Sequence, residues 1–161
     1  MSNAPYDIEK IKRQAKESIG QGALTTDYAL DVKEACALLN EALATEIMCV
    51  LRYQHHAISA KGIDSKEVKE EFSEHAEEEA EHMLMIAERI NQLGGEPNFD
   101  PKFVVENSTT EYGQATTLID MIKDDLVAER IAIMVYRKLI AWFGDKDSTT
   151  RIMLEKILKQ E

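Results

Sequence analysis

The sequence predicts an all-α protein: a four-helix bundle with one long connection, preceded by a short extra helix. Three observations lead to this fold class. The 161 residues match one domain in length and include only seven glycines and three prolines. Apolar residues recur at helical spacing through four long segments. Between the second and third of these segments lies a stretch rich in turn residues, GEPNFDPKFVVENSTTEYG at 95–113, which is expected to form a long connection without helix.

Residues 1–30 are predicted to form an N-terminal extension with one short amphipathic helix at about 7–19, ending at Gly20 and Gly22. This helix carries a small group of basic residues interrupted by acidic ones: Lys10, Lys12, Arg13 and Lys16. An interrupted group of this kind is typical of an ordinary amphipathic helix, so a DNA-binding arm is not expected here.

The bundle itself is predicted over residues 31–161. Its four helices are expected at about 31–60, 64–94, 114–143 and 147–161. Asp31 and Glu34 have the spacing of a capping box, and Asp64 with Glu67 repeats that pattern at the second bundle helix. The last helix is still continuing where the sequence stops, so it is expected to be truncated.

Each predicted bundle helix carries one glutamate on an otherwise apolar or aromatic stripe. Core-facing positions of a bundle helix recur at alternating steps of three and four residues. This rule selects Leu39, Leu43, Glu46, Val50, Tyr53 and Ala57; then Val68, Phe72, His75, Glu79, His82 and Ile86; then Ile122, Leu126, Glu129, Ile133, Tyr136 and Ile140; and finally Leu154, Leu158 and Glu161. The segment EFSEHAEEEAEHMLMIAERI at 71–90 contains seven glutamates, and among them only Glu79 is predicted to face the interior.

Four inward glutamates indicate a metal site. A buried ionised carboxylate is costly unless it is paired, protonated or bound to metal, and no lysine or arginine lies on the four stripes. Two divalent cations would cancel the four negative charges. His82 follows Glu79 by three residues and shares its helix face, and carboxylates with imidazole suit iron or manganese better than zinc. The predicted ligands are therefore Glu46, Glu79, His82, Glu129 and Glu161.

Two aromatic side chains are predicted to lie beside this site. Tyr53 is close enough in helical rotation to donate a hydrogen bond to a ligand carboxylate. His75 precedes Glu79 on the same stripe and is expected either to be a satisfied interior histidine or to line an access path. His55 and His56 are expected to be polar surface or cap residues rather than ligands. A bundle that binds no metal is the structural alternative to this interpretation.

Over about residues 35–161 the chain resembles the ferritin superfamily, and within it bacterioferritin-like and Dps-like proteins. The resemblance rests on LNEALATEIMCVLRYQ, EEEAEHMLMIAERINQLGGEPNF, LVAERIAIMVYRKLI and GDKDSTTRIMLEKILKQE. It implies a ferritin-like bundle with two irons per subunit. In that arrangement Glu46 and Glu129 resemble terminal ligands, Glu79 and Glu161 bridging carboxylates, His82 a ligand of the first iron, and Tyr53 the tyrosine beside the site.

Some positions depart from the family pattern. The family continues with a histidine three residues after the glutamate at Glu161, so either the chain is a truncated form or the site lacks a second histidine. Bacterioferritin binds haem through a methionine at the position of Ala80, so haem is not expected. The N-terminal extension, and the lack of a fifth bundle-type helix, leave both a 24-subunit cage and a 12-subunit Dps-like shell open.

The resemblance implies a ferroxidase that oxidises Fe(II) with O₂ or H₂O₂ and stores iron in a homo-oligomeric shell, with manganese as another metal that could be loaded. A non-storing di-metal enzyme, either a rubrerythrin-type peroxidase or a manganese catalase, and a Dps-like DNA-protecting shell are the alternatives. The net charge of −11 opposes binding to DNA phosphates. The sequence has neither a membrane-spanning apolar run nor a signal-peptide pattern, so a cytoplasmic location is expected.

Overall fold

The structure, a computed structural model, describes residues 4–62 and 65–161. These residues form α-helices and one 3-10 helix, and no strand occurs among them, which confirms the predicted all-α class. The helices are α1 (Ile8–Glu17), α2 (Val32–Ser59), α3 (Ser65–Gln92), α4 (Pro101–Asn107), α5 (Leu118–Phe143), the 3-10 helix η1 (Gly144–Asp147) and α6 (Ser148–Gln160).

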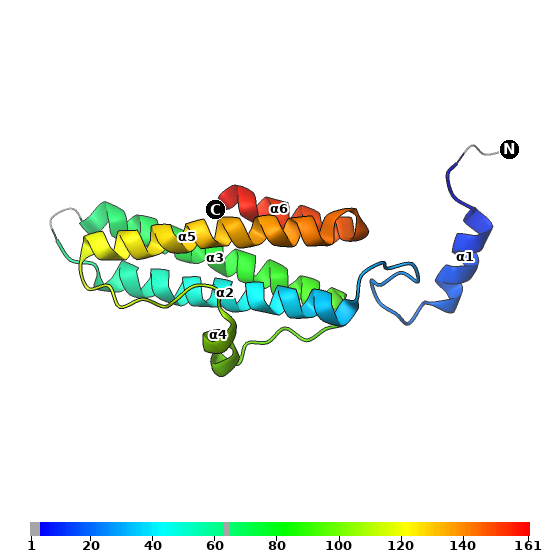
Figure 1. The fold of residues 1–161 in the computed structure, drawn as a ribbon, viewed down its shortest axis with the longest axis horizontal. Helices are drawn as coiled ribbons and strands as arrows, with labels where there is room; N and C mark the ends of the chain where they lie inside the picture. Colours follow the sequence, from blue (N-terminus) through cyan, green and yellow to red (C-terminus); the bar gives the residue numbers. More distant parts are fainter. Residues whose placement is uncertain (1–3, 63–64) are drawn as a thin grey trace.

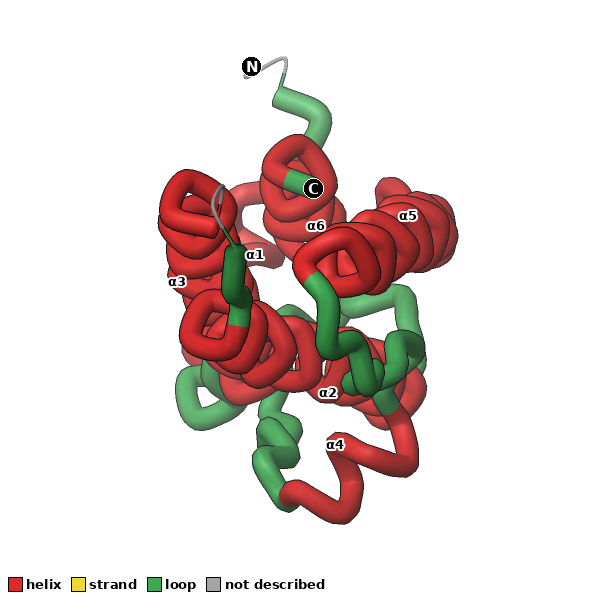
Figure 2. The backbone as a smooth tube through the Cα atoms, turned by 90° about the vertical axis from the view of Figure 1, so that its left-hand side faces the viewer, coloured by secondary structure: helices red, strands yellow, loops and turns green. Residues whose placement is uncertain are grey.

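Helices α2, α3, α5 and α6 form the bundle, which Figure 2 shows end-on. α2 packs against α3 as one antiparallel pair and α5 against α6 as the other (Figure 1). α6 has 13 residues, whereas α2 and α3 have 28 each. α6 ends part of the way along the bundle, and beyond its end α3 and α5 are separated by a cleft among the described residues (Figure 1).

The long connection returns along the outside of α2 and contains α4, so the prediction of a segment without helix at 95–113 is wrong. Asp100 caps α4, and Pro101 occupies the first turn, where its missing N–H has no helical partner to lose. Val104 is buried against α2. Pro101 led to the prediction that no helix forms in this segment. Pro101 instead begins α4, because it directly follows the capping residue Asp100.

The N-terminal caps explain where the bundle helices begin. The Asp31 side chain accepts a hydrogen bond from the Glu34 backbone N–H at 2.9 Å, as the capping-box pattern predicted. Thr117 caps α5, so this helix begins after Thr117 rather than at Gln114. The cap predicted at Asp64 lies outside the described residues.

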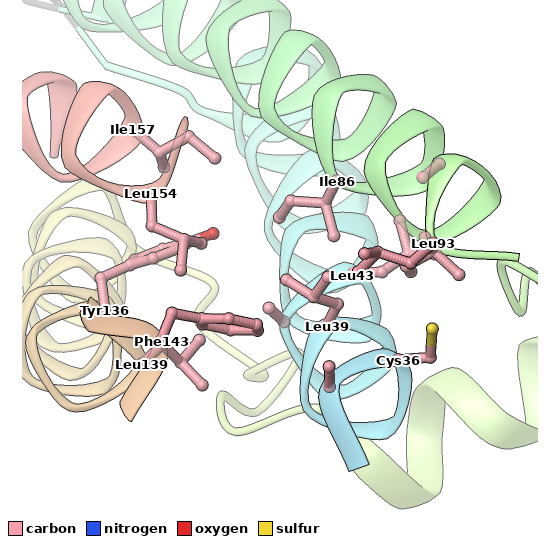
Figure 3. Packing of buried hydrophobic residues seen from close by; sticks show 14 of the residues in the cluster. Cys36, Leu39, Leu43, Ile86, Leu93, Tyr136, Leu139, Phe143, Leu154 and Ile157 are labelled. Carbon is pink, nitrogen blue, oxygen red and sulfur yellow. The ribbon is translucent and has the colours of Figure 1, made fainter. Parts of the chain in front are cut away.

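The apolar core consists of two clusters with polar residues between them. The larger cluster, shown in Figure 3, includes Leu39, Leu43, Ile86, Ile90, Tyr136, Phe143, Leu154 and Ile157. The smaller cluster lies towards the other end of the bundle, later in α2 and earlier in α3, and includes Cys49, Tyr53, Phe72, Ala76 and Met121. Glu46 and Glu79 fall between the two clusters along their helices, and each is almost fully buried. The core is therefore interrupted where the sequence places its inward carboxylates.

The buried face of α5 differs from the predicted stripe. Leu126 was predicted to be a core residue, but 63% of it is exposed to solvent. The buried positions of α5 are Met121, Asp125, Ala128, Ala132, Tyr136, Leu139 and Phe143. Leu126 faces the side of α5 that α6 does not reach, so a position with correct helical spacing remains uncovered.

The segment between α1 and α2 is fixed to one end of the bundle. Leu24, Tyr28 and Leu30 pack against the larger core cluster, and the Tyr28 hydroxyl donates a hydrogen bond to Asp147 at 2.8 Å. Arg89 donates to the same carboxylate at 3.1 Å. α1 itself stands away from the bundle in Figure 1.

Candidate metal centre

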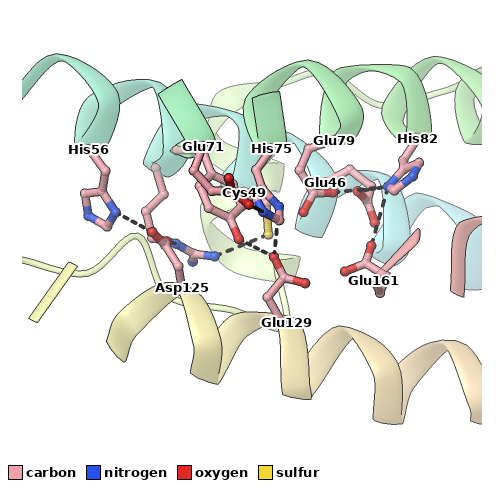
Figure 4. A network of polar contacts seen from close by, with 12 residues as sticks. Glu46, Cys49, His56, Glu71, His75, Glu79, His82, Asp125, Glu129 and Glu161 are labelled. Atoms are coloured by element: carbon pink, nitrogen blue, oxygen red, sulfur yellow. Dashed lines mark hydrogen bonds and ion pairs between the residues drawn. The ribbon is translucent and has the colours of Figure 1, made fainter. Parts of the chain in front are cut away.

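Four of the predicted ligands, Glu46, Glu79, His82 and Glu161, meet in the middle of the bundle, and we call them the carboxylate cluster. Their potential ligand atoms all lie within 4.8 Å of one another. The His82 Nδ1 atom is the centre of the group, at 3.3 Å from Glu79, 3.4 Å from Glu161 and 3.5 Å from Glu46 (Figure 4). Each of the four side chains is at most 5% exposed.

Two oxygens of the cluster are buried without a hydrogen-bond partner among the described residues: Glu46 Oε2 and Glu161 Oε1. Buried polar atoms are almost always satisfied in folded proteins, and unpaired carboxylate oxygens are especially costly. Hard carboxylate oxygens with one imidazole are a suitable ligand set for a divalent ion such as iron or manganese. The residues present therefore fit a metal ion, and their role as ligands stays a prediction.

Each of two tyrosines holds a carboxylate on the opposite helix. The Tyr136 hydroxyl of α5 donates to Glu46 of α2, and the Tyr53 hydroxyl of α2 donates to Glu129 of α5. In both helices the tyrosine follows the glutamate by seven residues, and because α2 and α5 are antiparallel each tyrosine reaches across to the other helix. Tyr53 thus contacts a predicted ligand, and Tyr136, which the sequence suggested only as a core aromatic, does so as well.

Glu129 is not a member of the carboxylate cluster but lies beside it. Its side chain is 17% exposed, and its Oε1 atom is 3.5 Å from His75 Nδ1. One small pocket is lined by His75, Glu79, His82, Glu129 and Glu161 together. The structure therefore gathers four predicted ligands tightly and places Glu129 across a narrow space from them.

A wider cleft of about 660 Å³ leads from the surface to this point. It lies between α3 and α5 where α6 has ended, and its walls are mostly apolar: Val68, Phe72, Ile122, Leu126 and Ile133. Glu129, Glu161 and His75 also line it. The cleft and the polar centre of the bundle therefore share Glu129, Glu161 and His75.

Burial and mutual repulsion keep protons on the metal-free cluster. Burial, together with the adjacent Glu46, raises the pKa of Glu79 to about 8. Burial also raises the pKa of Glu161 to about 7, and it raises the pKa of Glu129 above its ordinary value. Burial lowers the pKa of His82 because it disfavours the charged imidazolium. The opposite effect of the neighbouring carboxylates is larger and raises the His82 pKa to about 12; these are Glu161, Glu46 and Glu79. A metal ion that binds here must displace protons.

We expect the metal-free protein to lose stability as the pH rises from about 5 to 8. Glu79 ordinarily titrates at 4.5 but keeps its proton up to about pH 8 in the folded state, so the folded chain binds more protons over this range. The free energy of unfolding then decreases with rising pH. His82 acts in the same direction above pH 6.5, because its folded pKa is about 12. Urea unfolding of the metal-free protein at pH 5, 6.5 and 8 measures this slope; a rise in stability over that range would contradict it.

A second buried polar group, which the sequence analysis did not find, lies next to the metal centre. The Asp125 carboxylate accepts a hydrogen bond from Arg52 Nε at 2.9 Å and lies 2.8 Å from His56 Nδ1. His56 was predicted at the surface, but it is only 1% exposed, so that prediction is wrong. Arg52 also donates to the backbone carbonyl of Glu111 at 2.7 Å.

The signal for this group was present in the spacing. Arg52 and His56 are one turn apart on α2, and Asp125 is one turn before Glu129 on α5. The predicted stripes passed through the neighbouring positions and missed all three. A basic residue therefore neutralises one interior carboxylate, whereas none of the described lysines or arginines makes an ion pair with the carboxylate cluster.

Buried carboxylates and a histidine at the centre of a four-helix bundle define a helical-bundle protein with a candidate metal site. The sequence model of the ferritin-like domain family matches residues 36–161, and the chain belongs to that family. No helix among the described residues is long and apolar enough to cross a membrane.

Known relatives include Dps-type proteins and a thioferritin. A nutrient stress-induced DNA-binding protein of Synechococcus sp. is 30% identical over 128 residues, covering 78% of this chain and 73% of the relative. A DNA protection during starvation protein of Pyrococcus furiosus is 27% identical over 135 residues, covering 82% and 73%. Among solved structures, the dodecameric thioferritin of Bacteroides fragilis is 30% identical with a TM-score of 0.78, and the match covers 94% of this chain and 85% of that one.

Proposed function

We propose that this protein is a ferroxidase that binds Fe(II) at the carboxylate cluster and stores the oxidised iron inside a homo-oligomeric shell in the cytoplasm. The observation that supports this most strongly is the grouping of three buried carboxylates around the single imidazole of His82, in which Glu46 Oε2 and Glu161 Oε1 accept no hydrogen bond among the described residues. A divalent cation would satisfy both oxygens and relieve the repulsion among the acidic side chains. Iron bound there would give electrons to O₂ or H₂O₂.

The surrounding residues have separate tasks in this proposal. Glu46, Glu79, His82 and Glu161 bind the iron, and Glu129 binds it on the side of the cleft. Tyr136 and Tyr53 orient Glu46 and Glu129 through their hydroxyl groups. Preorganised ligands lose little conformational freedom when the ion arrives, so the site binds more tightly than flexible surface carboxylates would.

Several exposed glutamates of α3 would attract Fe(II) towards the molecule: Glu70, Glu74, Glu77, Glu78, Glu81 and Glu88. A surface with one sign of charge raises the local concentration of ions of the opposite sign. The burial of the four cluster side chains then limits solvent around the bound ion. In the proposed organisation, residues 1–30 are an extension and 31–161 form the iron-binding bundle.

The 30% identical thioferritin of Bacteroides fragilis is described as a dodecamer, which supports a twelve-subunit shell for this chain. A DNA-protecting shell is the second candidate, because the Synechococcus and Pyrococcus relatives are named for DNA binding and DNA protection. The net charge of −11 opposes DNA binding, so iron storage is the function that we favour.

Iron titration with oxygen present tests the proposal. We expect about two irons per chain to be oxidised rapidly, as for a paired metal site, followed by many more that remain soluble with the protein. Uptake that stops after the first rapid phase would favour a non-storing peroxidase or catalase instead. A gel shift with duplex DNA at low and physiological salt separates the DNA-protecting candidate, since binding to phosphates weakens steeply with salt.

A further inference from the structure

We propose that His75 provides the imidazole of a second metal position, which it shares with Glu129 at the cleft end of the carboxylate cluster. This inference rests on the proposed metal binding and adds a ligand to it. His75 precedes Glu79 by four residues on α3, so the two side chains lie on one face of the helix. Figure 4 shows His75 between the surface glutamate Glu71 and the interior glutamate Glu129.

The two ring nitrogens of His75 have different neighbours. Nδ1 lies 3.5 Å from Glu129 Oε1, inside the bundle, and Nε2 lies 3.5 Å from Glu71 Oε1, towards solvent. His82 has the same arrangement one heptad later: Nδ1 faces the carboxylate cluster and Nε2 lies 3.3 Å from the amide oxygen of Gln160. Metal-binding histidines usually donate their outer N–H to such an acceptor, which leaves the inner nitrogen free for the ion.

His75 is held in place without being buried. Its ring stacks on that of Tyr53, with centroids 5.1 Å apart and planes at 18°. The same tyrosine donates to Glu129, so one residue positions both proposed ligands. The His75 side chain is 33% exposed and lines both the cleft and the small pocket. His75 thus lines the cleft, whereas His82 is 2% exposed and does not.

The distances suit one shared ion. Two ligand atoms 3.5 Å apart can both reach a cation with bonds of roughly 2.1 Å, the usual length for nitrogen and carboxylate ligands of Zn²⁺. Glu79 and Glu161 line the same small pocket and could share their second oxygens with this position. The centre would then contain two imidazoles, one at each end, with the carboxylates between them.

Binding of Zn²⁺ and Co²⁺ under anaerobic conditions, measured by calorimetry and by the visible absorption of Co²⁺, tests the role of His75. We expect about two ions per chain in the wild type, as for a two-metal site, and one in His75→Ala. Glu71→Gln should lower the affinity for the second ion by about 10–100-fold and leave the affinity for the first ion unchanged. His55→Ala is the matched control, because that exposed histidine stacks on Tyr112 rather than facing the centre.

The outcomes separate this inference from the proposed function. If His75→Ala still binds two ions with unchanged affinity, His75 is not a ligand, although the metal centre stands. If the wild type binds no ion, both the proposed function and the role of His75 are overturned. Helical circular dichroism of each variant confirms that a loss of binding does not reflect unfolding.

An independent observation concerns α1, whose apolar face is not buried against the bundle in the part of the chain that the structure describes. We propose that this face packs against a second copy of the protein. None of the ten described residues of α1 is buried, and Ile8 and Ile11 are 50% and 44% exposed. Ala15 continues the same face, and Ile19, just after the helix, is 89% exposed. These positions recur every three to four residues, as in a helix that packs on one side.

α1 is well capped but too short to be stable alone. Asp7 accepts hydrogen bonds from the backbone N–H groups of Glu9 and Lys10, at 3.0 and 3.1 Å. Isolated helices shorter than about 12–15 residues are marginal in water, so α1 needs a surface that buries its isoleucines. The bundle of its own chain does not provide one, since α1 stands clear of it in Figure 1.

Charge favours a copy of this chain as that surface. Residues 7–19 carry four basic and three acidic side chains, a net charge of +1, so the remainder of the −11 chain carries −12. A helix that is slightly basic is attracted to the acidic body of a second copy. The same body would be repelled by nucleic-acid phosphates or an anionic membrane once α1 approached either. The segment between α1 and α2 is held to its own bundle by Tyr28, so α1 extends from a defined end of each subunit.

Native mass spectrometry and sedimentation of an Ile8→Ser/Ile11→Ser variant test the role of α1. We expect the variant to form smaller assemblies than the wild type and its α1 amides to lose protection from hydrogen exchange. Ile58→Ser/Ile152→Ser is the control, because both isoleucines are exposed, 81% and 59%, on other helices. Assemblies of unchanged size overturn the proposal. So does wild-type binding to duplex DNA or phosphatidylserine vesicles that the double variant loses.

Discussion

Glu79→Gln is expected to abolish rapid Fe(II) oxidation and, in the same molecule, to stabilise the metal-free bundle. The amide keeps the size of the side chain but removes the charge that binds metal. Removing a residue that only hydrogen-bonds to a metal ligand typically lowers metal affinity or activity by about 10–100-fold. Removing a ligand itself should therefore reduce the oxidation rate by at least ~100-fold. Stopped-flow absorbance after mixing with Fe(II) and oxygen measures the rate.

The stability effect has the opposite sign because the Glu79 carboxyl is costly when no metal is bound. Its pKa of about 8 means that ionisation is unfavourable in the folded state, and the variant has no charge to bury. Urea unfolding at pH 8 should therefore show a metal-free variant at least as stable as the metal-free wild type. The variant should also gain less stability from added Zn²⁺, since binding to the folded state is weaker.

Glu81→Gln is the matched control on the same helix. Glu81 is exposed and does not belong to the carboxylate cluster, so the Glu81→Gln variant should oxidise Fe(II) at the wild-type rate. Oxidation by Glu79→Gln at the wild-type rate would show that iron is oxidised elsewhere on the protein. A strongly destabilised Glu79→Gln variant would contradict the account of the metal-free cluster.

Helical periodicity in the sequence was sufficient to predict the bundle and the region of the site. Glu46 and Glu79 were placed correctly in the interior because each is flanked by apolar residues at three- and four-residue steps. Asp31 likewise predicted where α2 begins, since a cap is a local interaction that depends on neighbouring residues alone. Features that depend on one helix and its nearest turn are visible without a structure.

Features that depend on how far another helix extends were not visible. Leu126 has the correct spacing for a core residue, but its 63% exposure depends on which other helices of the described residues pack over that part of α5. The partner of Glu129 is Tyr53 on a different helix, which follows from the antiparallel packing of α2 and α5. Glu129 lines the cleft and is not part of the carboxylate cluster. The periodicity of α5 alone could not predict this position, because it depends on the other helices.

The interior of the bundle thus contains two kinds of buried carboxylate. Asp125 is neutralised by the chain itself, through Arg52 and the adjacent His56. The carboxylate cluster has His82 as its only basic neighbour among the described ion pairs, which leaves a net negative site. The first arrangement stabilises the fold without a ligand, and the second requires protons or a cation. Only the second is therefore expected to respond to metal.

Asp125→Ala is expected to be the most destabilising single substitution in this part of the bundle. It leaves the Arg52 guanidinium buried without its carboxylate, and breaking one side of a buried pair typically costs about 3–5 kcal/mol. The side chains of Arg52 and Asp125 are 1% and 5% exposed, so the pair is a buried one. Urea unfolding at neutral pH measures the change, which should be the same with and without added metal.

Removing both charges should recover much of that loss. Replacing a buried ion pair by apolar residues of similar size is often neutral, so the Arg52→Met/Asp125→Leu double variant should be more stable than Asp125→Ala. Glu106→Ala is the surface control: its ion pair with Lys102 spans 3.9 Å at an exposed site, and exposed pairs contribute about 0–1 kcal/mol. If Asp125→Ala were no more destabilising than Glu106→Ala, the Arg52–Asp125 pair would not hold α2 against α5, and the tyrosine contacts would have to do so instead.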